Sequence, residues 1–281
     1  WGAPQQRPRR GGGGGGGLPA PVLRPETVGE LTGGFRLVDC DCSYAYKSDS
    51  VILRGVSLEV RAGSVVAVNG ASGSGKSSVL KTAYLRLQPF KGHVEYEVLA
   101  PVEGGSRQTF WRRFSPLTHS AAEIREQVAV CSLETLGTFF ASVEINVACA
   151  AGEREVTSED VRNACELAGL DGVVYEKLND GYFTPIGGPS GVALNNDLLV
   201  RLSLARAIVR KPKIVILDES DHFAYVVGVP LLKSVLHRLA EGGSAVLFSA
   251  WNYELAKELV KPPPGDSGAD LIYFLRNGQV S

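Results

Sequence analysis

Eight consecutive residues of this chain carry the residue types that hold a phosphate group. They read Gly70-Ala71-Ser72-Gly73-Ser74-Gly75-Lys76-Ser77, are followed by Ser78, and match the pattern G-x-x-x-x-G-K-[ST] in full. The glycines let successive backbone N–H groups point at one centre. The Lys76 ammonium can then bind the β- and γ-phosphates of a nucleotide, and the Ser77 hydroxyl can hold Mg²⁺. A strand before this loop and a helix after it would give the motif the context that it needs.

A pair of acids follows an apolar strand much later in the chain. Residues Ile214–Leu217 are apolar, and Asp218 and Glu219 come directly after them. At the carboxyl end of a parallel strand, these acids are expected to lie beside the phosphate loop. Asp218 is predicted to hold Mg²⁺ through water, and Glu219 to act as the general base on an attacking water. A buried strand with an acidic cap is the alternative, and the presence of the phosphate loop favours the functional interpretation.

The elements that must position these motifs alternate between apolar strands and helices. Val65–Val68 and Ala245–Phe248 are continuous apolar runs, typical of strands that are covered on both faces. Helices are predicted from Lys76 to about Arg86, from Leu198 to Arg210 and over residues 231–239, and Asn277-Gly278 marks a hairpin turn. This alternation predicts an α/β fold with a largely parallel sheet.

The N-terminal segment has a simpler amino-acid composition than the rest of the chain. Residues 1–33 contain seven glycines from Gly11 to Gly17 and a small cluster of arginines. Such a segment buries too little apolar surface to offset its ordering entropy, so we expect a disordered, Gly/Pro/Arg-rich linker. Order is predicted to begin near Phe35, with one folded domain over 34–281. Residues 101–122 are rich in Gly, Ser and Arg and are predicted to be an inserted surface loop.

Composition narrows the function classes. The net charge of −1 over 281 residues argues against a dedicated nucleic-acid binder, and no apolar stretch approaches the length of a membrane span. Five cysteines without paired metal spacing are expected to be free, buried thiols of a reducing compartment. The chain starts with Trp1 and contains no Met, so we expect it to be a piece of a longer protein.

On these residues the chain resembles the nucleotide-binding domain of ABC transporters, over roughly residues 34–281. The most specific parts are Ser203-Leu204-Ala205-Arg206-Ala207, Lys211-Pro212-Lys213, the strand Ile214–Glu219, Asp180-Gly181-Tyr182 and Ile186-Gly187. The residue pattern over 128–147 is most similar to that of the multidrug-resistance/sulfonylurea-receptor branch. The resemblance implies a P-loop NTPase fold, with a RecA-like parallel core, an antiparallel β subdomain and a helical subdomain over about 134–212.

The resemblance also implies ligands, partners and a location. ATP and Mg²⁺ would bind through Gly70–Ser78, with Ser77 and Asp218 on the metal. Tyr44 would stack on adenine, a core tyrosine being the alternative. Ser142–Val147 resembles the segment that faces transmembrane domains of the same or another chain. The domain would therefore lie at the cytoplasmic face of a membrane, as part of an integral membrane transporter.

Three places depart from the family pattern. Leu194-Asn195-Asn196-Asp197-Leu198 replaces the signature Leu-Ser-Gly-Gly-Gln, and Asp197 brings negative charge to where a partner's γ-phosphate would approach. Leu133 and Glu134 stand near the expected glutamine. Trp251 stands at the switch histidine, while His222 is interpreted as a surface or interface residue rather than as a displaced switch. We therefore expect slow hydrolysis and a heterodimeric pair with a second nucleotide-binding domain.

These residues support three functions to different degrees. The leading one is an ATP-binding domain that couples ATP binding and weak hydrolysis to transport across a membrane by a longer polypeptide. A non-transport ABC-type ATPase that acts as a regulatory or interaction module is the alternative, and Ser142–Val147 favours the transporter. A stand-alone P-loop kinase is opposed by the 142 residues (218 − 76) between Lys76 and Asp218.

Overall fold

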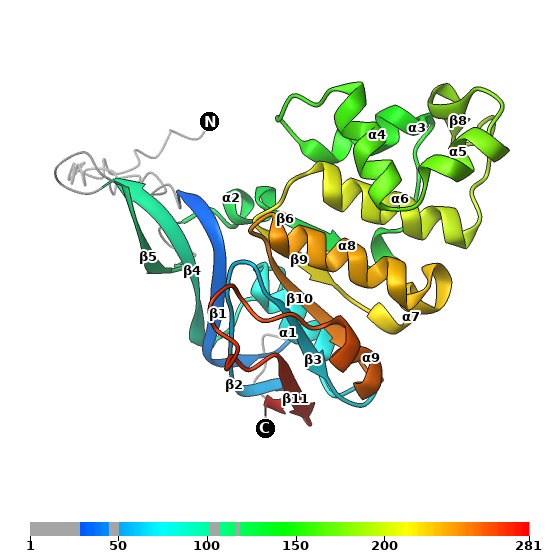
Figure 1. Cartoon of the computed structure of the whole chain (residues 1–281). Helices are drawn as coiled ribbons and strands as arrows, with labels where there is room; N and C mark the ends of the chain where they lie inside the picture. Colours follow the sequence, from blue (N-terminus) through cyan, green and yellow to red (C-terminus); the bar gives the residue numbers. More distant parts are fainter. Residues whose placement is uncertain (1–28, 45–50, 102–106, 116–118, 281) are drawn as a thin grey trace, which may run out of the picture.

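The computed structural model describes residues 29–44, 51–101, 107–115 and 119–280, which form two larger sheets, one two-stranded sheet and a group of helices (Figure 1). Most of the predicted linker over 1–33 lies outside these residues. Strand β1 (Glu30–Cys42) begins before Phe35, and Leu31 is fully buried. The first strand thus starts earlier than the sequence predicted, because Leu31 belongs to a buried hydrophobic core.

The larger sheet confirms the predicted parallel core. Its order is β12-β11-β3-β10-β9-β6, and every neighbouring pair except β11 and β12 is parallel. The strands are β3 (Val65–Asn69), β6 (Val128–Cys131), β9 (Ile214–Leu217), β10 (Ala245–Ala250), β11 (Ile272–Arg276) and β12 (Gln279–Val280). The hairpin between β11 and β12 turns at Asn277 and Gly278, both with positive φ, as the sequence predicted.

The smaller sheet is antiparallel, with the order β2-β1-β4-β5. Its other strands are β2 (Leu53–Val60), β4 (Lys91–Pro101) and β5 (Arg107–Arg113). The prediction of a surface loop over 101–122 is wrong in part, because β5 pairs with β4 along its whole length. The Arg36 guanidinium stacks on the Trp111 ring at 4.5 Å, a cross-strand contact that composition does not reveal.

Nine α-helices occur among the described residues. They are α1 (Lys76–Ala83), α2 (Ala121–Glu126), α3 (Val143–Ala148), α4 (Ser158–Leu167), α5 (Asp171–Lys177), α6 (Asn196–Val209), α7 (Ser220–Val227), α8 (Val229–Glu241) and α9 (Tyr253–Leu259). Helix α1 ends before the predicted Arg86, and Leu85 just beyond it has a left-handed φ of 60°. None of these helices is both long enough and apolar enough to cross a membrane.

The helices α3 to α6 gather on one side of the parallel sheet, away from β4 and β5 (Figure 1). They enclose a small pair of strands, β7 (Ala141–Ser142) and β8 (Pro185–Ile186). One hydrophobic core lies between the parallel sheet and the helices α3 to α9, and a second lies between the two larger sheets and α1. The arrangement agrees with the predicted division into a parallel core, an antiparallel part and a helical part.

The cysteines depart from expectation at one position. Four of them are buried, whereas Cys149 is exposed because the turn after α3 leaves it at the surface. Burial raises the pKa of Cys40 and Cys131 to about 11 and that of Cys165 to about 12. These three thiols are therefore protonated near neutral pH.

We predict that iodoacetamide labels one cysteine of the native protein at pH 8, and that this residue is Cys149. Only roughly one in a thousand molecules of a thiol with a pKa of about 11 is a thiolate at this pH, and burial also blocks access. Mass spectrometry should count one label on the native chain and five after unfolding. The Cys149→Ser variant should take none while folded, and labelling of native Cys131 would contradict the structure.

Candidate functional site

A cavity of about 990 Å³ opens at the carboxyl ends of β3 and β9. It brings together the two motifs that the sequence separates by more than half of the chain. Its lining from the phosphate loop and the start of α1 comprises Ala71, Ser72, Gly73, Gly75, Lys76, Ser77 and Ser78. Its remaining lining comprises Tyr44, Ile52, Leu133, Asp218, Glu219, Asp221, His222, Ser249 and Trp251. Ligands of open α/β sheets bind at this edge.

The phosphate loop is shaped by its own backbone and by Lys76. The Lys76 ammonium donates to the carbonyl oxygens of Gly70 and Ala71, both at 2.8 Å, and so bridges the loop. Burial lowers the pKa of Lys76, while the charges of Asp218 and Asp221 act in the opposite direction. Gly75 has a φ of 105° directly before α1, a conformation that favours glycine.

Gly70 and Ser74 belong to the predicted loop but do not line this cavity. They line a hollow of about 590 Å³ beside the β11–β12 hairpin. A Cβ atom at Gly70 would stand 2.4 Å from the carbonyl oxygen of Leu275, so this position must be glycine. Both residues therefore lie on the side of the loop that faces the β11–β12 hairpin.

The two acids are held by a residue that the sequence analysis missed. The Ser249 hydroxyl of β10 donates to Asp218 Oδ1 at 2.5 Å, and it accepts the Glu219 N–H at 2.8 Å. The same N–H lies 3.0 Å from Asp218 Oδ1, and Glu219 has a left-handed φ of 59°. The available signal was a lone polar residue in the otherwise apolar strand Ala245–Ala250.

Oxygen donors suited to Mg²⁺ meet in this cavity. The Ser77 hydroxyl and the Asp218 carboxylate both line it, and hard cations prefer such ligands. No cluster of three or more His, Cys, Asp or Glu side chains that could hold a metal occurs among the described residues. The set therefore fits Mg²⁺ that completes its coordination shell with phosphate oxygens and water, rather than a metal held by protein alone.

Helix α7 connects the acids with the segment after β10 and with the start of α6. Asp221 accepts the backbone N–H groups of Trp251 and Asn252, at 2.9 and 3.1 Å. His222 lies 3.2 Å from the side-chain amide nitrogen of Asn196, the first residue of α6. His222, which the sequence analysis interprets as a surface or interface residue, is half-buried and lines the cavity. Trp251 lines the same cavity and is 68% exposed.

Tyr44 stands at the mouth of the cavity. Its side chain is 59% exposed, so the alternative of a core tyrosine is wrong. The phenol oxygen lies 3.2 Å from the Ser78 hydroxyl, which links the Tyr44 segment to α1. An exposed ring at the rim of a phosphate-binding cavity can stack on a flat base.

The divergent signature segment lies outside this cavity, at the start of α6. The Asn195 side chain accepts the Leu198 N–H at 3.0 Å, so the helix caps its own N-terminus. Asp197 forms an ion pair with Arg201 at 3.0 Å. The charge of Asp197 is therefore less free than the sequence alone indicated, because a partner lies one turn along the same helix. Leu194 and Leu198 pack towards the core.

Near the expected glutamine, the two candidate residues separate. Leu133 lines the cavity, and Glu134 forms an ion pair with Lys81 at 3.5 Å. An apolar side chain thus occupies this wall. Leucine has no atom that can ligate Mg²⁺ or orient water.

A buried network shapes an exposed surface on the helical part. Asn146 is fully buried, and its side-chain amide donates to the carbonyl oxygens of Phe139, Ala141 and Ser142. The Arg206 guanidinium donates to the Asn146 carbonyl at 2.7 Å and to its side-chain oxygen at 2.9 Å. This network holds the loop before α3, where Phe139 and Phe140 are exposed, and Ile145 of α3 is exposed next to that loop.

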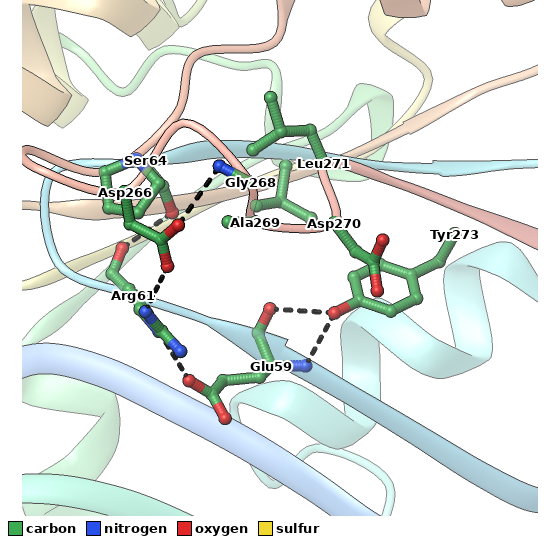
Figure 2. A pocket seen from close by; sticks show the side chains of 11 residues that line it. Glu59, Arg61, Ser64, Asp266, Gly268, Ala269, Asp270, Leu271 and Tyr273 are labelled. Carbon is green, nitrogen blue, oxygen red and sulfur yellow. Dashed lines mark hydrogen bonds and ion pairs between the residues drawn. The ribbon is translucent and has the colours of Figure 1, made fainter.

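A second cavity, of about 320 Å³, lies at the opposite edge of the sheet, near the amino ends of β3 and β11 (Figure 2). Arg61 bridges Glu59 and Asp266, at 2.7 and 2.6 Å. The Tyr273 hydroxyl bonds to both backbone groups of Glu59 at 3.2 Å. These bonds connect the end of β2 to β11 and to the segment before it. The residues around this cavity therefore have a structural role.

Comparison with known proteins agrees with the geometry. The family model described as "ABC transporter" matches residues 53–222. The multidrug resistance protein pgp-1 of Caenorhabditis elegans is 28% identical over 251 residues, which cover 89% of this chain and 17% of that protein. The ATP-dependent permease MDL1 of Candida albicans is 28% identical over 255 residues, covering 90% of this chain and 33% of the permease. This chain therefore spans a minor part of these relatives.

A solved structure matches the fold. A bacterial Atm1-family ABC exporter with ATP bound superimposes with a TM-score of 0.67, over 93% of this chain and 40% of the exporter chain, at 20% identity. At this identity, the likeness concerns the fold alone.

We predict that Ser249→Ala lowers the affinity for ATP in the presence of Mg²⁺ by about tenfold, because Asp218 loses a hydrogen bond to a charged group. The affinity measured in excess chelator should change little. Calorimetric titration with and without Mg²⁺ distinguishes the two. Ser244→Ala is the matched control, since Ser244 is also buried and bonds the Pro212 carbonyl before β10, outside the cavity. An equal loss without Mg²⁺ would contradict the positioning of Asp218.

Proposed function

Because the chain belongs to the ABC transporter family and is one of its ATP-binding domains, an ATPase by class, we propose that its 990 Å³ cavity binds MgATP on behalf of a membrane transporter. The longer polypeptide or complex that contains it would use ATP binding and slow hydrolysis to move a substrate across the membrane. The observation that carries the proposal is the meeting of Lys76, Ser77, Asp218 and Glu219 in one cavity.

Each predicted residue takes a role that its chemistry allows. Tyr44 stacks on the base, and Gly70–Ser78 surround the phosphates with backbone N–H groups and the Lys76 ammonium. Ser77 and Asp218 hold Mg²⁺, which neutralises phosphate charge when bound. Glu219 orients and deprotonates the attacking water. Ser249 keeps Asp218 and Glu219 in register by bonding both.

Slow hydrolysis follows from the walls of the cavity. Leu133 offers no polar atom, and Trp251 offers one N–H that cannot accept a proton. Losing one well-placed transition-state contact typically costs ~10²–10³ in rate. The chain therefore binds nucleotide with a complete set of groups and hydrolyses it with an incomplete one.

A membrane-domain partner fits the exposed surface next to α3. The exposed side chains Phe139 and Phe140 precede Ser142–Val147, and Ile145 is exposed within it. The Asn146–Arg206 network bonds to this part of the chain. Exposed apolar side chains on a fixed loop are typical of protein interaction sites. We therefore assign this surface to transmembrane domains and place the chain at the cytoplasmic face of a membrane. The relatives named above are a multidrug resistance protein and a permease, which gives no support to the non-transport alternative.

We further propose that this domain pairs with a different nucleotide-binding domain. In a head-to-tail pair, the start of α6 of one domain would face the terminal phosphate bound by the other. Here the Asn195 side chain accepts the Leu198 N–H of α6, and Asp197 adds negative charge. Two copies of this chain would thus present poor signature segments to both nucleotides, and a partner with an intact signature would relieve one site.

We predict that Lys76→Ala lowers the affinity for MgATP by about a hundredfold, the effect of losing hydrogen bonds to a charged phosphate. Calorimetric titration of the isolated chain measures it. Lys81→Ala is the control, because Lys81 lies on the same helix but pairs with Glu134 and does not line the cavity. Equal affinities for the wild type and Lys76→Ala would overturn the proposal.

We also predict that MgATP leaves the isolated chain monomeric, even in Glu219→Gln, which suppresses hydrolysis. Replacing Asn195, Asn196 and Asp197 with Ser, Gly and Gly should produce ATP-dependent homodimers, because the change removes the negative charge of Asp197 and the bulk of Asn196 from the start of α6. Analytical ultracentrifugation with and without MgATP measures both. A stable ATP-induced homodimer of the unaltered sequence would refute the asymmetric pair.

A further inference from the structure

The hollow between the phosphate loop and the β11–β12 hairpin is a second cavity on the same loop. Its volume of about 590 Å³ is large enough for a small organic ligand. Ala71, Ser72 and Gly73 line both this hollow and the nucleotide cavity. The loop is therefore a wall with a cavity on each side, and in the proposed function MgATP occupies only one of the two.

The charge of this hollow favours an anion. Among the described residues that line it, Arg276 is the only ionisable one. No ion pair joins the Arg276 guanidinium to another described side chain. The planar fork of a guanidinium matches the two oxygens of a carboxylate. A phosphate monoester carries nearly two negative charges, so a single guanidinium would leave part of that charge without a partner.

An aromatic surface lies next to Arg276. Phe274 is two residues earlier in β11, so both side chains lie on the same face of the strand. Leu275 is buried in the core on the other face, where Tyr273 lines the opposite cavity (Figure 2). Phe274 is 43% exposed, and its ring centroid lies 5.5 Å from that of Tyr253, which is also exposed. An aromatic ring of a ligand can stack on this surface.

The floor of the hollow contains a hydroxyl group without a partner. Ser74 lines the hollow and is 8% exposed. Its buried Oγ atom has no hydrogen-bond partner among the described residues. A buried polar group that makes no hydrogen bond is costly. An acceptor oxygen at this floor would provide the missing bond.

We propose that this hollow binds an aromatic carboxylate, a ligand with a flat ring and a single negative charge, and that this ligand weakens the binding of MgATP. The carboxylate pairs with the Arg276 guanidinium, and the ring lies on Phe274 and Tyr253. Charge complementarity and the exposed rings select this class of ligand. The binding itself goes beyond the proposed function, whereas the effect on MgATP rests on it.

The sign of the coupling follows from the shared wall. An unpaired Arg276 adds positive potential next to the loop that would surround the phosphates. A carboxylate cancels this potential and brings its own negative charge towards them, which disfavours a second anion. The Lys76 ammonium bonds to the Gly70 and Ala71 carbonyls, so it belongs to the same wall. The coupling is reciprocal, and MgATP therefore weakens the binding of the carboxylate by the same factor.

The first test uses phenylacetate as the probe, with phenylacetamide and acetate as matched compounds that lack the charge and the ring. Phenylacetate should bind the nucleotide-free chain with a dissociation constant in the roughly millimolar range expected for its size. Each matched compound should bind about tenfold more weakly. In the ¹H–¹⁵N spectrum, the amide signals of Ser74 and Arg276 should shift, whereas that of Ser77 should stay in place.

Two variants assign the binding to the hollow. Arg276→Gln should lower the affinity for phenylacetate about tenfold, because the charged hydrogen bonds are lost. Phe274→Ala should reduce the affinity to that of acetate. Arg238→Gln and Phe183→Ala are the matched controls, because both side chains are exposed and neither lines the hollow or the nucleotide cavity. Both controls should bind phenylacetate as the wild type does.

The second test measures the coupling. MgATP is titrated calorimetrically into the chain in saturating phenylacetate and in sodium acetate of the same concentration, which keeps the ionic strength equal. The affinity of the wild type for MgATP should fall about fivefold in phenylacetate, at the lower end of typical couplings between sites. The affinity of Arg276→Gln should be the same in both solutions.

The outcomes separate the two proposals. Equal affinities for phenylacetate and phenylacetamide, or for the wild type and Arg276→Gln, would overturn the site. Shifts at Ser77 without shifts at Arg276 would place the probe in the nucleotide cavity and overturn it as well. An affinity for MgATP that phenylacetate leaves unchanged would overturn the coupling. Failure of the wild type to bind MgATP at all would overturn the proposed function and the coupling, while the first test would still decide the site.

Discussion

The parallel pairing of β10 with β3 on one side and with β9 on the other is the constraint on which the candidate site depends. This register aligns Ala250 with Asn69 and Phe248 with Leu217, so the three strands end at nearly the same level. The phosphate loop leaves β3 at that edge, and Asp218 and Glu219 leave β9 there. A shift of one residue would turn Ser249 to the opposite face of the sheet and separate it from both acids.

Helix α7 connects this edge of the sheet to the segment after β10 and to α6. It begins directly after Glu219, whose left-handed backbone turns the chain sharply out of β9. Its first turn then makes side-chain bonds in two directions, through Asp221 to the segment after β10 and through His222 to α6. The His222 side chain thus connects the cavity to the divergent signature segment at the start of α6.

The helical part is organised by a different kind of interaction. Burying the polar groups of Asn146 and Arg206 is favourable because they bond to backbone carbonyls, to the Phe139 N–H and to each other. The network bonds directly to the backbone of the loop that carries Phe139 and Phe140 and so restrains it. A rigid loop is a suitable place for an interaction surface, because binding there costs little ordering entropy. The nucleotide cavity and this surface therefore lie on separate parts of the chain, both anchored to the helix α6.

Local sequence signals determined the phosphate loop, the acids after β9, the parallel core and the β11–β12 turn. In each case neighbouring residues hold the whole signal, as glycine spacing, an apolar run or the pair Asn277-Gly278. Only the tertiary structure decided that Ser249 holds the acids, that His222 faces the cavity and that Arg201 pairs with Asp197. It also decided that residues 107–113 form a strand and that Cys149 is exposed. These features depend on which strands and helices pack together and at what register, and on where each side chain meets a partner from elsewhere in the chain, and no pattern of neighbouring residues records that choice.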